Sequence, residues 1–135
     1  MTVGEAMSPV RITVGTSHTL REAARRMTRG QAGSAVVLDP ALPGPGIITE
    51  RDVLRCIAED GDVDLALVGE YVARNVVYAA ADWPLERAAE EMTAEGFRHL
   101  IVLDGSEAVG VLSMRDIVRA WVETGAPAQA TALAG

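Results

Sequence analysis

The strongest constraint on the fold of this sequence is an internal repeat, which any architecture for the chain has to accommodate. Segments of the first half return 65 positions later, or 64 positions later after a single deletion. The matching pairs are Val3-Gly4-Glu5 with Val68-Gly69-Glu70, Ala35-Val36-Val37-Leu38-Asp39 with Leu100-Ile101-Val102-Leu103-Asp104, and Arg51-Asp52 with Arg115-Asp116.

The repeat predicts the domain organisation. We expect one copy over residues 1–62, a second over residues 63–124, and a flexible tail at 125–135. Each copy has roughly 60 residues, which is close to the size at which burial of apolar surface barely offsets chain entropy. The two copies are therefore expected to pack together as one pseudo-symmetric unit.

The composition narrows the class of protein. The chain has 135 residues, 49% of them hydrophobic, and a formal net charge of −7. These values are globular, and the acidic charge argues against nucleic acid as a main partner. No apolar run reaches the roughly 18 residues of a membrane span, and the N-terminus lacks a signal-peptide pattern. Because the single Cys56 cannot form an internal disulfide, we expect a cytoplasmic protein. Because the sequence has no membrane span, we also expect no membrane partner.

Apolar periodicity and turn residues predict strand, helix, strand, strand and helix in each copy, an α+β pattern. Residues 59–64 are expected to form an acidic linker between the copies. The expected elements of the first copy are a strand at 11–14, a helix from the Thr19 cap to Gly30, strands at 35–38 and 47–48, and a helix at 52–58. Those of the second are a strand at 75–78, a helix from about 82–84 to Gly96, strands at 100–103 and 109–112, and a helix at 116–122.

A short motif at the last strand-to-helix junction occurs in both copies. A glycine precedes two apolar residues, a hydroxyl residue, two further positions and an aspartate, as Gly46-Ile47-Ile48-Thr49-Glu50-Arg51-Asp52 and Gly110-Val111-Leu112-Ser113-Met114-Arg115-Asp116. One interpretation is a capping box, in which the hydroxyl and the carboxylate satisfy the helix N-terminus. The other is a nucleotide site, in which the carboxylate accepts the ribose hydroxyls and the arginine pairs with phosphate. The two roles are compatible.

The order of these motifs resembles a tandem pair of CBS (cystathionine-β-synthase-type) domains, also called a Bateman module, of the stand-alone bacterial type. The first copy carries Met7-Ser8-Pro9, Ile12-Thr13-Val14 and Thr19-Leu20-Arg21-Glu22-Ala23-Ala24 before its Gly46–Asp52 motif. The second copy carries Phe97-Arg98-His99-Leu100 before its own. The resemblance implies two βαββα repeats packed as a pseudo-two-fold pair with two symmetry-related clefts.

In the family these clefts bind adenosine-containing ligands, so the resemblance implies AMP, ADP, ATP, S-adenosylmethionine or NADH as candidates, with no required cofactor. It assigns ribose binding to the two aspartates and ribose or phosphate contacts to the two hydroxyl residues. Arg98 and His99 occur in one copy only, so equal affinity at the two clefts is not expected. The ligand-binding residues implied are Gly46, Thr49, Arg51, Asp52, Gly110, Ser113, Arg115, Asp116, Thr13, Val14, Ala35, Val77, Arg98, His99 and Leu100.

No catalytic or metal-binding residues are expected. The two histidines, His18 and His99, show no metal-ligand spacing, and His99 is either a structural residue or a cleft residue. Cys56 has no identifiable base beside it in the sequence, and we interpret it as a core residue. An enzyme is therefore the least favoured class.

The first long helices of the two copies carry opposite charge. Residues 21–29 hold four arginines against one glutamate, a net charge of +3, whereas residues 86–95 hold one arginine against four glutamates, a net charge of −3. Either both faces are solvated, or the two helices face each other across a head-to-tail homodimer. We expect a regulatory adenine-nucleotide sensor that acts on an effector protein, or alternatively a ligand-free homodimeric interaction scaffold.

Overall fold

The computed structural model describes residues 1–72 and 76–125. The chain forms two compact units: the first unit is Val10–Val76, and the second unit combines Met1–Pro9 with the chain from Val77 onward. Both units mix helices with a small sheet, so the α+β class with two repeats is confirmed. Of the tail predicted at 125–135, residues 126–135 lie outside the described residues.

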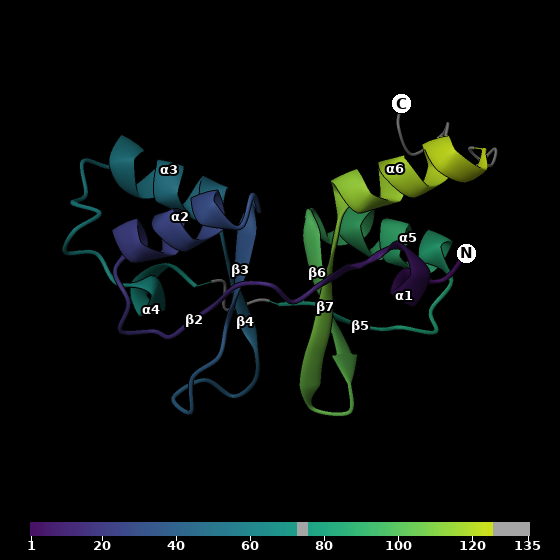
Figure 1. Ribbon diagram of the computed structural model, residues 1–135, viewed down its shortest axis with the longest axis horizontal. Helices are drawn as coiled ribbons and strands as arrows, with labels where there is room; N and C mark the ends of the chain where they lie inside the picture. Colours follow the sequence, from purple (N-terminus) through teal and green to yellow (C-terminus); the bar gives the residue numbers. More distant parts are fainter. Residues whose placement is uncertain (73–75, 126–135) are drawn as a thin grey trace. The chain divides into compact units, whose positions relative to one another are not determined.

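The first unit has a three-stranded sheet in the order β2-β3-β4, with β2 parallel to β3 and β3 antiparallel to β4. Helices α2 and α3 lie next to each other against this sheet, and α4 lies near the start of α2 (Figure 1). The elements are β2 (Thr13–Val14), α2 (Leu20–Arg29), β3 (Ser34–Val37), β4 (Gly46–Thr49), α3 (Glu50–Ala58) and α4 (Val68–Tyr71).

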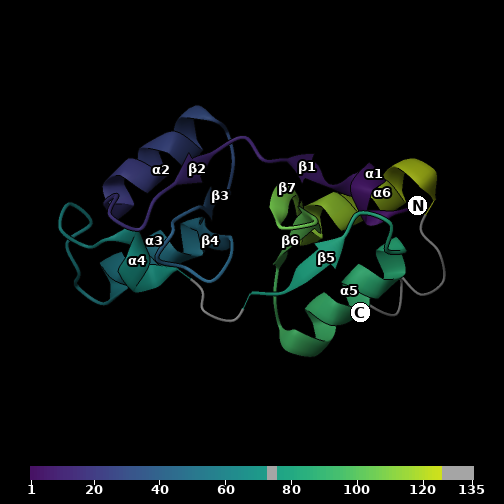
Figure 2. The same ribbon diagram turned by 90° about the horizontal axis from the view of Figure 1, so that it is seen from below.

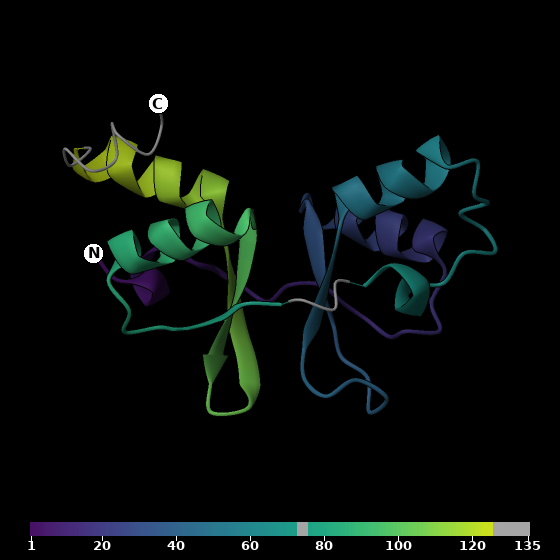
Figure 3. The same ribbon diagram turned by 180° about the vertical axis from the view of Figure 1, so that it is seen from behind.

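The second unit repeats this plan and adds a strand. Its sheet has the order β1-β7-β6-β5, in which β5 is parallel to β6 and the other pairs are antiparallel. Helices α5 and α6 cover the sheet (Figure 3). The elements are α1 (Val3–Ala6), β1 (Ser8–Pro9), β5 (Tyr78–Ala80), α5 (Leu85–Glu95), β6 (His99–Asp104), β7 (Glu107–Ser113) and α6 (Met114–Thr124).

Local sequence explains where the long helices begin and end. The Thr19 hydroxyl accepts a hydrogen bond from Glu22 N at 3.1 Å, which caps α2, and the helix ends at Gly30. Helix α5 follows Pro84 and ends at Gly96, whose φ of 73° is a left-handed conformation that glycine adopts without strain. Both boundaries agree with the sequence expectation.

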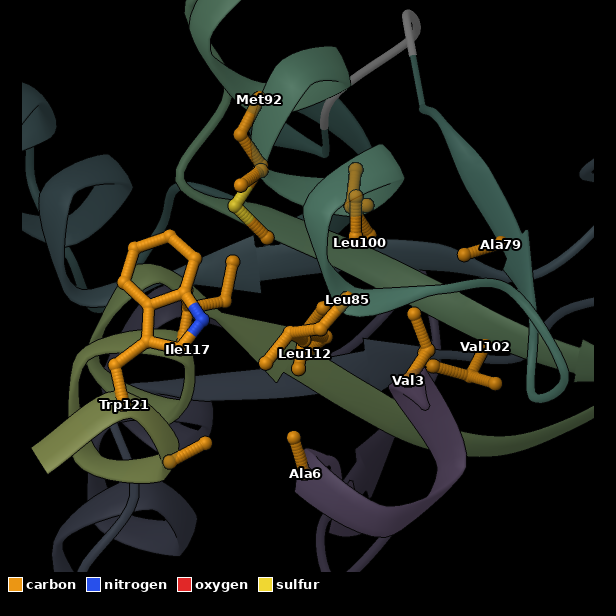
Figure 4. Packing of buried hydrophobic residues seen from close by; sticks show 13 residues of the cluster. Val3, Ala6, Ala79, Leu85, Met92, Leu100, Val102, Leu112, Ile117 and Trp121 are labelled. Carbon is orange, nitrogen blue, oxygen red and sulfur yellow. The ribbon is translucent and has the colours of Figure 1, made fainter. Parts of the chain in front are cut away.

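Each unit has its own hydrophobic core. In the second unit Leu85, Leu100, Leu112 and Ile117 are fully buried, and the indole of Trp121 lies beside them (Figure 4). The core of the first unit is built by the equivalent elements and contains Val14, Leu20, Ala23, Met27, Ala35, Val37, Ile48, Cys56, Val68 and Val72. Burial of one Leu-sized side chain contributes about 1.5–3 kcal/mol, so these clusters are the main source of stability.

The two repeats exchange their opening segments. Helix α1 opens the first repeat in sequence but lies in the second unit, beside α5 and α6 (Figures 1 and 2). Helix α4 opens the second repeat but lies in the first unit. Equivalent hydrogen bonds hold the two segments. Leu85 N donates to Met1 O at 3.0 Å, and its equivalent Leu20 N donates to Ala66 O at 2.9 Å. In the same way, Val3 N donates to Trp83 O at 2.9 Å and Val68 N donates to His18 O at 2.8 Å.

The exchange alters several expectations. The repeat boundary at 62/63 falls inside the first unit, so the compact units divide the chain differently from the sequence repeat. Within the linker expected at 59–64, Val63 O accepts a hydrogen bond from Arg21 N at 3.0 Å, and Val63 packs against the core of the first unit. Of the strand expected at 75–78, residue 75 lies outside the described residues and β5 begins at Tyr78.

Candidate functional site

In the first unit the repeated motif forms the junction from β4 to α3. The carboxylate of Asp52 turns back toward the strand: its Oδ2 accepts hydrogen bonds from Thr49 N at 2.8 Å and from Thr49 Oγ1 at 3.1 Å. Among residues 1–72 and 76–125, only Arg55 Nη2 donates to its Oδ1, at a long 3.4 Å, and the Asp52 side chain is 16% exposed. One oxygen of this carboxylate therefore retains capacity to accept further hydrogen bonds.

In the second unit the same junction, from β7 to α6, is more completely bonded. Ser113 N donates to Asp116 Oδ2 at 2.8 Å, and Asp116 N donates to Ser113 Oγ at 3.1 Å, which is a complete capping box. The other oxygen, Oδ1, accepts from Ser8 Oγ at 3.3 Å and from Arg119 Nη2. With a side chain only 7% exposed, Asp116 is committed to contacts inside its own unit.

The strand residues implied by the resemblance lie near the two junctions. In the first unit, Ala35 pairs with Ile48 next to Thr49, and Thr13 lies on the adjacent strand opposite Val36. The side chains of Val14 and Ala35 are buried in the core, so only their backbone can face a ligand.

The second unit has the same arrangement. His99 pairs with Ser113 across β6 and β7, and Leu100 pairs with Leu112. Val77 O accepts a hydrogen bond from Ile101 N at 3.2 Å, and Arg98 O accepts one from Met114 N at 2.9 Å. The Arg98 side chain is exposed, His99 is half-buried, and the Leu100 side chain belongs to the core.

Gly46 and Gly110 make room for the exchanged segments. A Cβ on Gly110 would lie 2.4 Å from Met7 Sδ and 2.9 Å from Ser8 O. A Cβ on Gly46 would lie 2.7 Å from Val72 Cγ2, and Val72 is the repeat equivalent of Met7. Such distances are shorter than any normal carbon contact, so the glycine of the motif has a packing role in both units.

The remaining positive charges differ between the junctions. Arg51 and Arg115 are exposed, and neither guanidinium pairs with a carboxylate in residues 1–72 or 76–125. Arg55 lies over the Tyr71 ring at 5.3 Å from the centroid, whereas its equivalent Arg119 binds Asp116. Ser8 and Arg119 were missed as partners of Asp116: Ser8 lies 108 positions away with no local signal, while the i, i+3 spacing of Arg119 pointed to it.

The described part of the chain contains neither a candidate metal site nor a membrane-spanning helix. Within residues 1–72 and 76–125, no three His, Cys, Asp or Glu side chains are grouped in a way that would hold a metal ion. Among the same residues, no helix combines the length and the apolar character that crossing a membrane requires.

Known proteins share the repeated sequence of this chain. Residues 3–59 and 68–123 match the family model of the CBS domain. An uncharacterized 17.7 kDa protein of Acidianus ambivalens is 36% identical over 106 residues, which are 78% of this chain and 63% of that protein. A CBS domain-containing protein of Arabidopsis thaliana is 30% identical over 104 residues, 76% of this chain and 19% of the relative. The chain thus spans less than two thirds of the length of these curated relatives.

Solved structures agree with the fold described above. A CBS domain protein from Pyrobaculum aerophilum complexed with AMP has a TM-score of 0.77 at 26% identity, with 91% of this chain and 99% of that chain covered. A putative signal-transduction protein with CBS domains from Burkholderia ambifaria has a TM-score of 0.82 at 26% identity, with 93% and 96% covered. A hexameric CBS-CP12 protein from bloom-forming cyanobacteria has a TM-score of 0.84 at 23% identity, with 95% and 76% covered, a likeness of fold alone. The doubled motif, the doubled sheet plan and the match over both stretches lead to one conclusion: the chain belongs to the CBS domain family and contains two CBS domains.

Proposed function

We propose that this protein is a regulatory module that binds an adenosine-containing ligand at the Asp52 junction of the first unit. The observation that carries the proposal is the inequality of the two aspartates. Oδ1 of Asp52 has one long contact and the side chain is 16% exposed, whereas Oδ1 of Asp116 has two donors and the side chain is 7% exposed. A ribose diol needs a carboxylate oxygen that is still free to accept.

The neighbouring residues have complementary roles in this proposal. The Thr49 hydroxyl lies within reach of the same ligand hydroxyls, and Arg51 supplies an exposed guanidinium for phosphate oxygens. The backbone of Thr13 and Ala35 would line the adenine. At the second junction Ser113, Arg115 and Asp116 form a weaker site, because a ligand would first have to displace Ser8 or Arg119 from the carboxylate.

The family supports a regulatory role over a catalytic one. CBS pairs are regulatory modules, and the Pyrobaculum relative is complexed with AMP. AMP, ADP, ATP, S-adenosylmethionine and NADH share the adenosine group that Asp52 would hold, and they remain the candidate ligands. The ligand would act by favouring one conformation of the pair for which it has higher affinity, and an effector protein would respond to that conformation.

A thermal-shift experiment with this ligand panel tests the proposal. Asp52→Asn keeps an oxygen that can cap α3 but removes the charge, so it should abolish the ligand-induced rise in melting temperature. The matched variant Asp116→Asn should retain most of that rise. A rise that survives Asp52→Asn but is lost in Asp116→Asn would contradict the assignment of the site to the first unit.

A ligand-free homodimeric scaffold is the second candidate, and one observation favours it. The charges of α2 are reversed at four equivalent positions of α5: Arg21 with Glu86, Glu22 with Arg87, Arg25 with Glu90, and Arg26 with Glu91. Such complementarity suits α2 of one protomer against α5 of its partner. Exposed apolar side chains accompany it on the last helix of each repeat, namely Leu54 and Ile57 on α3 and Val118 and Val122 on α6.

Charge exchange tests this head-to-tail homodimer. Arg25→Glu should weaken self-association, Glu90→Arg should weaken it equally, and the double variant should restore it. Sedimentation velocity over a dilution series measures the effect. A double variant that is weaker than either single variant would contradict the pairing, and an absence of ligand shifts in the wild type together with a restored dimer would favour the scaffold.

A further inference from the structure

An open groove on the first unit is lined by three arginines and is separate from the capping carboxylate. Arg11 and Thr13 contribute from the approach to β2 and its first residue, and Arg26 and Arg29 contribute from the last turns of α2. Ile12 and Gly30 complete the lining of this groove, whose volume is about 450 Å³. That volume falls within the range of small-molecule sites, roughly 300–1,000 Å³.

The three guanidiniums are held to different extents. Arg26 is fixed: its Nη1 donates to Thr13 O at 2.8 Å and its Nε donates to Glu22 Oε1 at 3.0 Å. Arg29 reaches the same Glu22 oxygen only at 3.6 Å and is 69% exposed. Arg11 is exposed and has no carboxylate partner among the residues that the structure describes. The single carboxylate of Glu22 therefore neutralises only part of the positive charge of the three arginines.

The electrostatics of Glu22 reflect this imbalance. The hydrogen bond from Arg26 lowers the pKa of the Glu22 carboxyl below its ordinary value, with further help from the nearby positive charges of Arg29 and Arg25. Glu22 is therefore ionised at neutral pH and already neutralises part of the cluster. The positive charge that remains lies on Arg11, just before β2, and on Arg29, in the last turn of α2.

The second repeat lacks the three arginines of this groove. The positions equivalent to Arg11, Arg26 and Arg29 are Val76, Glu91 and Ala94. The fold itself therefore does not require the arginines, since the second repeat builds the same helix and sheet without them. The C-terminus of α2, capped by Gly30, carries the negative end of the helix dipole, so an anion in the groove would depend on the arginines for its stabilisation.

We propose that the groove formed by Arg11, Arg26 and Arg29 binds a chain of linked phosphates. Arg11 lacks a carboxylate partner in the described part of the chain and Arg29 has only the contact at 3.6 Å, so the groove favours an anion long enough to reach both, because each planar guanidinium can hold one phosphate group by two parallel hydrogen bonds. The linked phosphates are either an inorganic polyphosphate or the tail of a nucleotide. Only the nucleotide source rests on the proposed function, whereas the anion site stands on the groove alone.

Calorimetric titration of the full chain at low ionic strength tests the proposal with four probes: tripolyphosphate, inorganic phosphate, AMP and ATP. Arg11→Ala and Arg29→Ala each remove one guanidinium from the groove and should weaken tripolyphosphate binding about tenfold or more, as expected for a lost charge-assisted contact. Arg87→Ala is the matched control, because it removes one positive charge from the equivalent helix of the second repeat. It should change the affinity by less than about twofold.

The nucleotide arms separate the two sources. If the tail of a nucleotide occupies the groove, Arg29→Ala weakens ATP about as much as tripolyphosphate and leaves AMP unchanged. If ATP is unaffected while tripolyphosphate is weakened, the ligand is a free polyphosphate. Tripolyphosphate binding without any nucleotide binding would support the anion site in the groove and contradict the proposed nucleotide-binding function.

Two results would overturn the groove itself. One is tripolyphosphate binding that is no tighter than that of inorganic phosphate at the same ionic strength. The other is an Arg87→Ala variant that loses as much affinity as Arg29→Ala, which would mean that only net charge matters. Arg11 and Arg29 are exposed, so both variants should unfold at the same temperature as the wild type without ligand, and that measurement confirms that they are folded.

Discussion

The Ser8 hydroxyl donates a hydrogen bond to Asp116 Oδ1 at 3.3 Å, across 108 positions of sequence. This bond joins the exchanged opening segment of the chain to the aspartate of the second junction. We therefore expect Asp116 to contribute more than Asp52 to the stability of the unliganded protein.

Asp116→Ala should lower the free energy of unfolding by about 2–3 kcal/mol, because it removes the cap of α6 and leaves Ser8 and Arg119 without their acceptor. Asp52→Ala should cost about 1 kcal/mol, the usual value for a lost cap. Urea titration without ligand measures both. Equal losses in the two variants would show that Ser8 and Arg119 add nothing to the stability.

Gly110→Ala should destabilise the protein by about 1–3 kcal/mol, because its Cβ would overlap Met7 Sδ and Ser8 O. Gly15→Ala is the control, since its Cβ would have no neighbour closer than 3.6 Å. Adding Met7→Ala should recover part of the loss by removing the sulfur atom. Thermal unfolding monitored by circular dichroism compares the three variants, and a Gly110→Ala variant as stable as Gly15→Ala would contradict the close approach of β1.

The compact units predict which fragment folds. Residues 10–76 contain Val68 and Val72 of the first core and the carbonyls of Val63 and Ala66 that bind the start of α2. Residues 1–62, the first copy in sequence, lack all of these. The 10–76 fragment should therefore give a dispersed amide NMR spectrum and cooperative unfolding, and the 1–62 fragment should give neither. A folded monomeric 1–62 fragment would contradict the exchange.

Asp39 predicts a dependence of stability on pH. The Thr16 hydroxyl, with the amides of Ala41 and Thr16, donates to its carboxylate and holds the pKa of Asp39 below its ordinary value. A depressed folded-state pKa stabilises the fold above the unfolded pKa of about 3.9, and this contribution is lost as the pH falls through the folded-state value. Asp39→Asn should therefore be destabilising at pH 7, and the difference from wild type should shrink toward pH 3.

The matched control is Asp104→Asn at the equivalent position of the second repeat. In the described part of the chain the Asp104 side chain makes no hydrogen bond of this kind, so the variant should change stability little at either pH. Urea midpoints at pH 7 and pH 3 give the comparison. A constant difference between Asp39→Asn and wild type at both values would rule out the Thr16 contact as its cause.

The sequence predicted the elements whose signals are local. The Thr19 cap, the Gly96 stop and the apolar runs of β3 and β6 each depend on a few neighbouring residues, and the structure confirms all of them. The short helices α1 and α4 were not expected, because four residues carry too little periodicity to be detected. Their identical Val-Gly-Glu cores were visible only as part of the repeat.

The candidate site shows the same division between local and long-range information. The capping geometry of Thr49 with Asp52 and of Ser113 with Asp116 follows from a three-residue spacing, and it was expected. The difference between the two aspartates depends on Ser8, whose position is set by the pairing of β1 with β7, and no local pattern reports such a contact. The groove at Arg11 likewise requires β2 to approach the end of α2.

The reciprocal exchange of α1 and α4 has a consequence for the ancestry of the chain. A single ancestral repeat would have carried its opening segment but lacked a partner for it within its own chain, so two copies would have traded these segments as a domain-swapped dimer. Joining the end of one copy to the beginning of the other would turn such a dimer into a single chain with two exchanged segments. The hydrogen bond from Leu85 N to Met1 O is equivalent to the one from Leu20 N to Ala66 O. This equivalence is expected if both were intermolecular hydrogen bonds before a gene fusion joined the two copies.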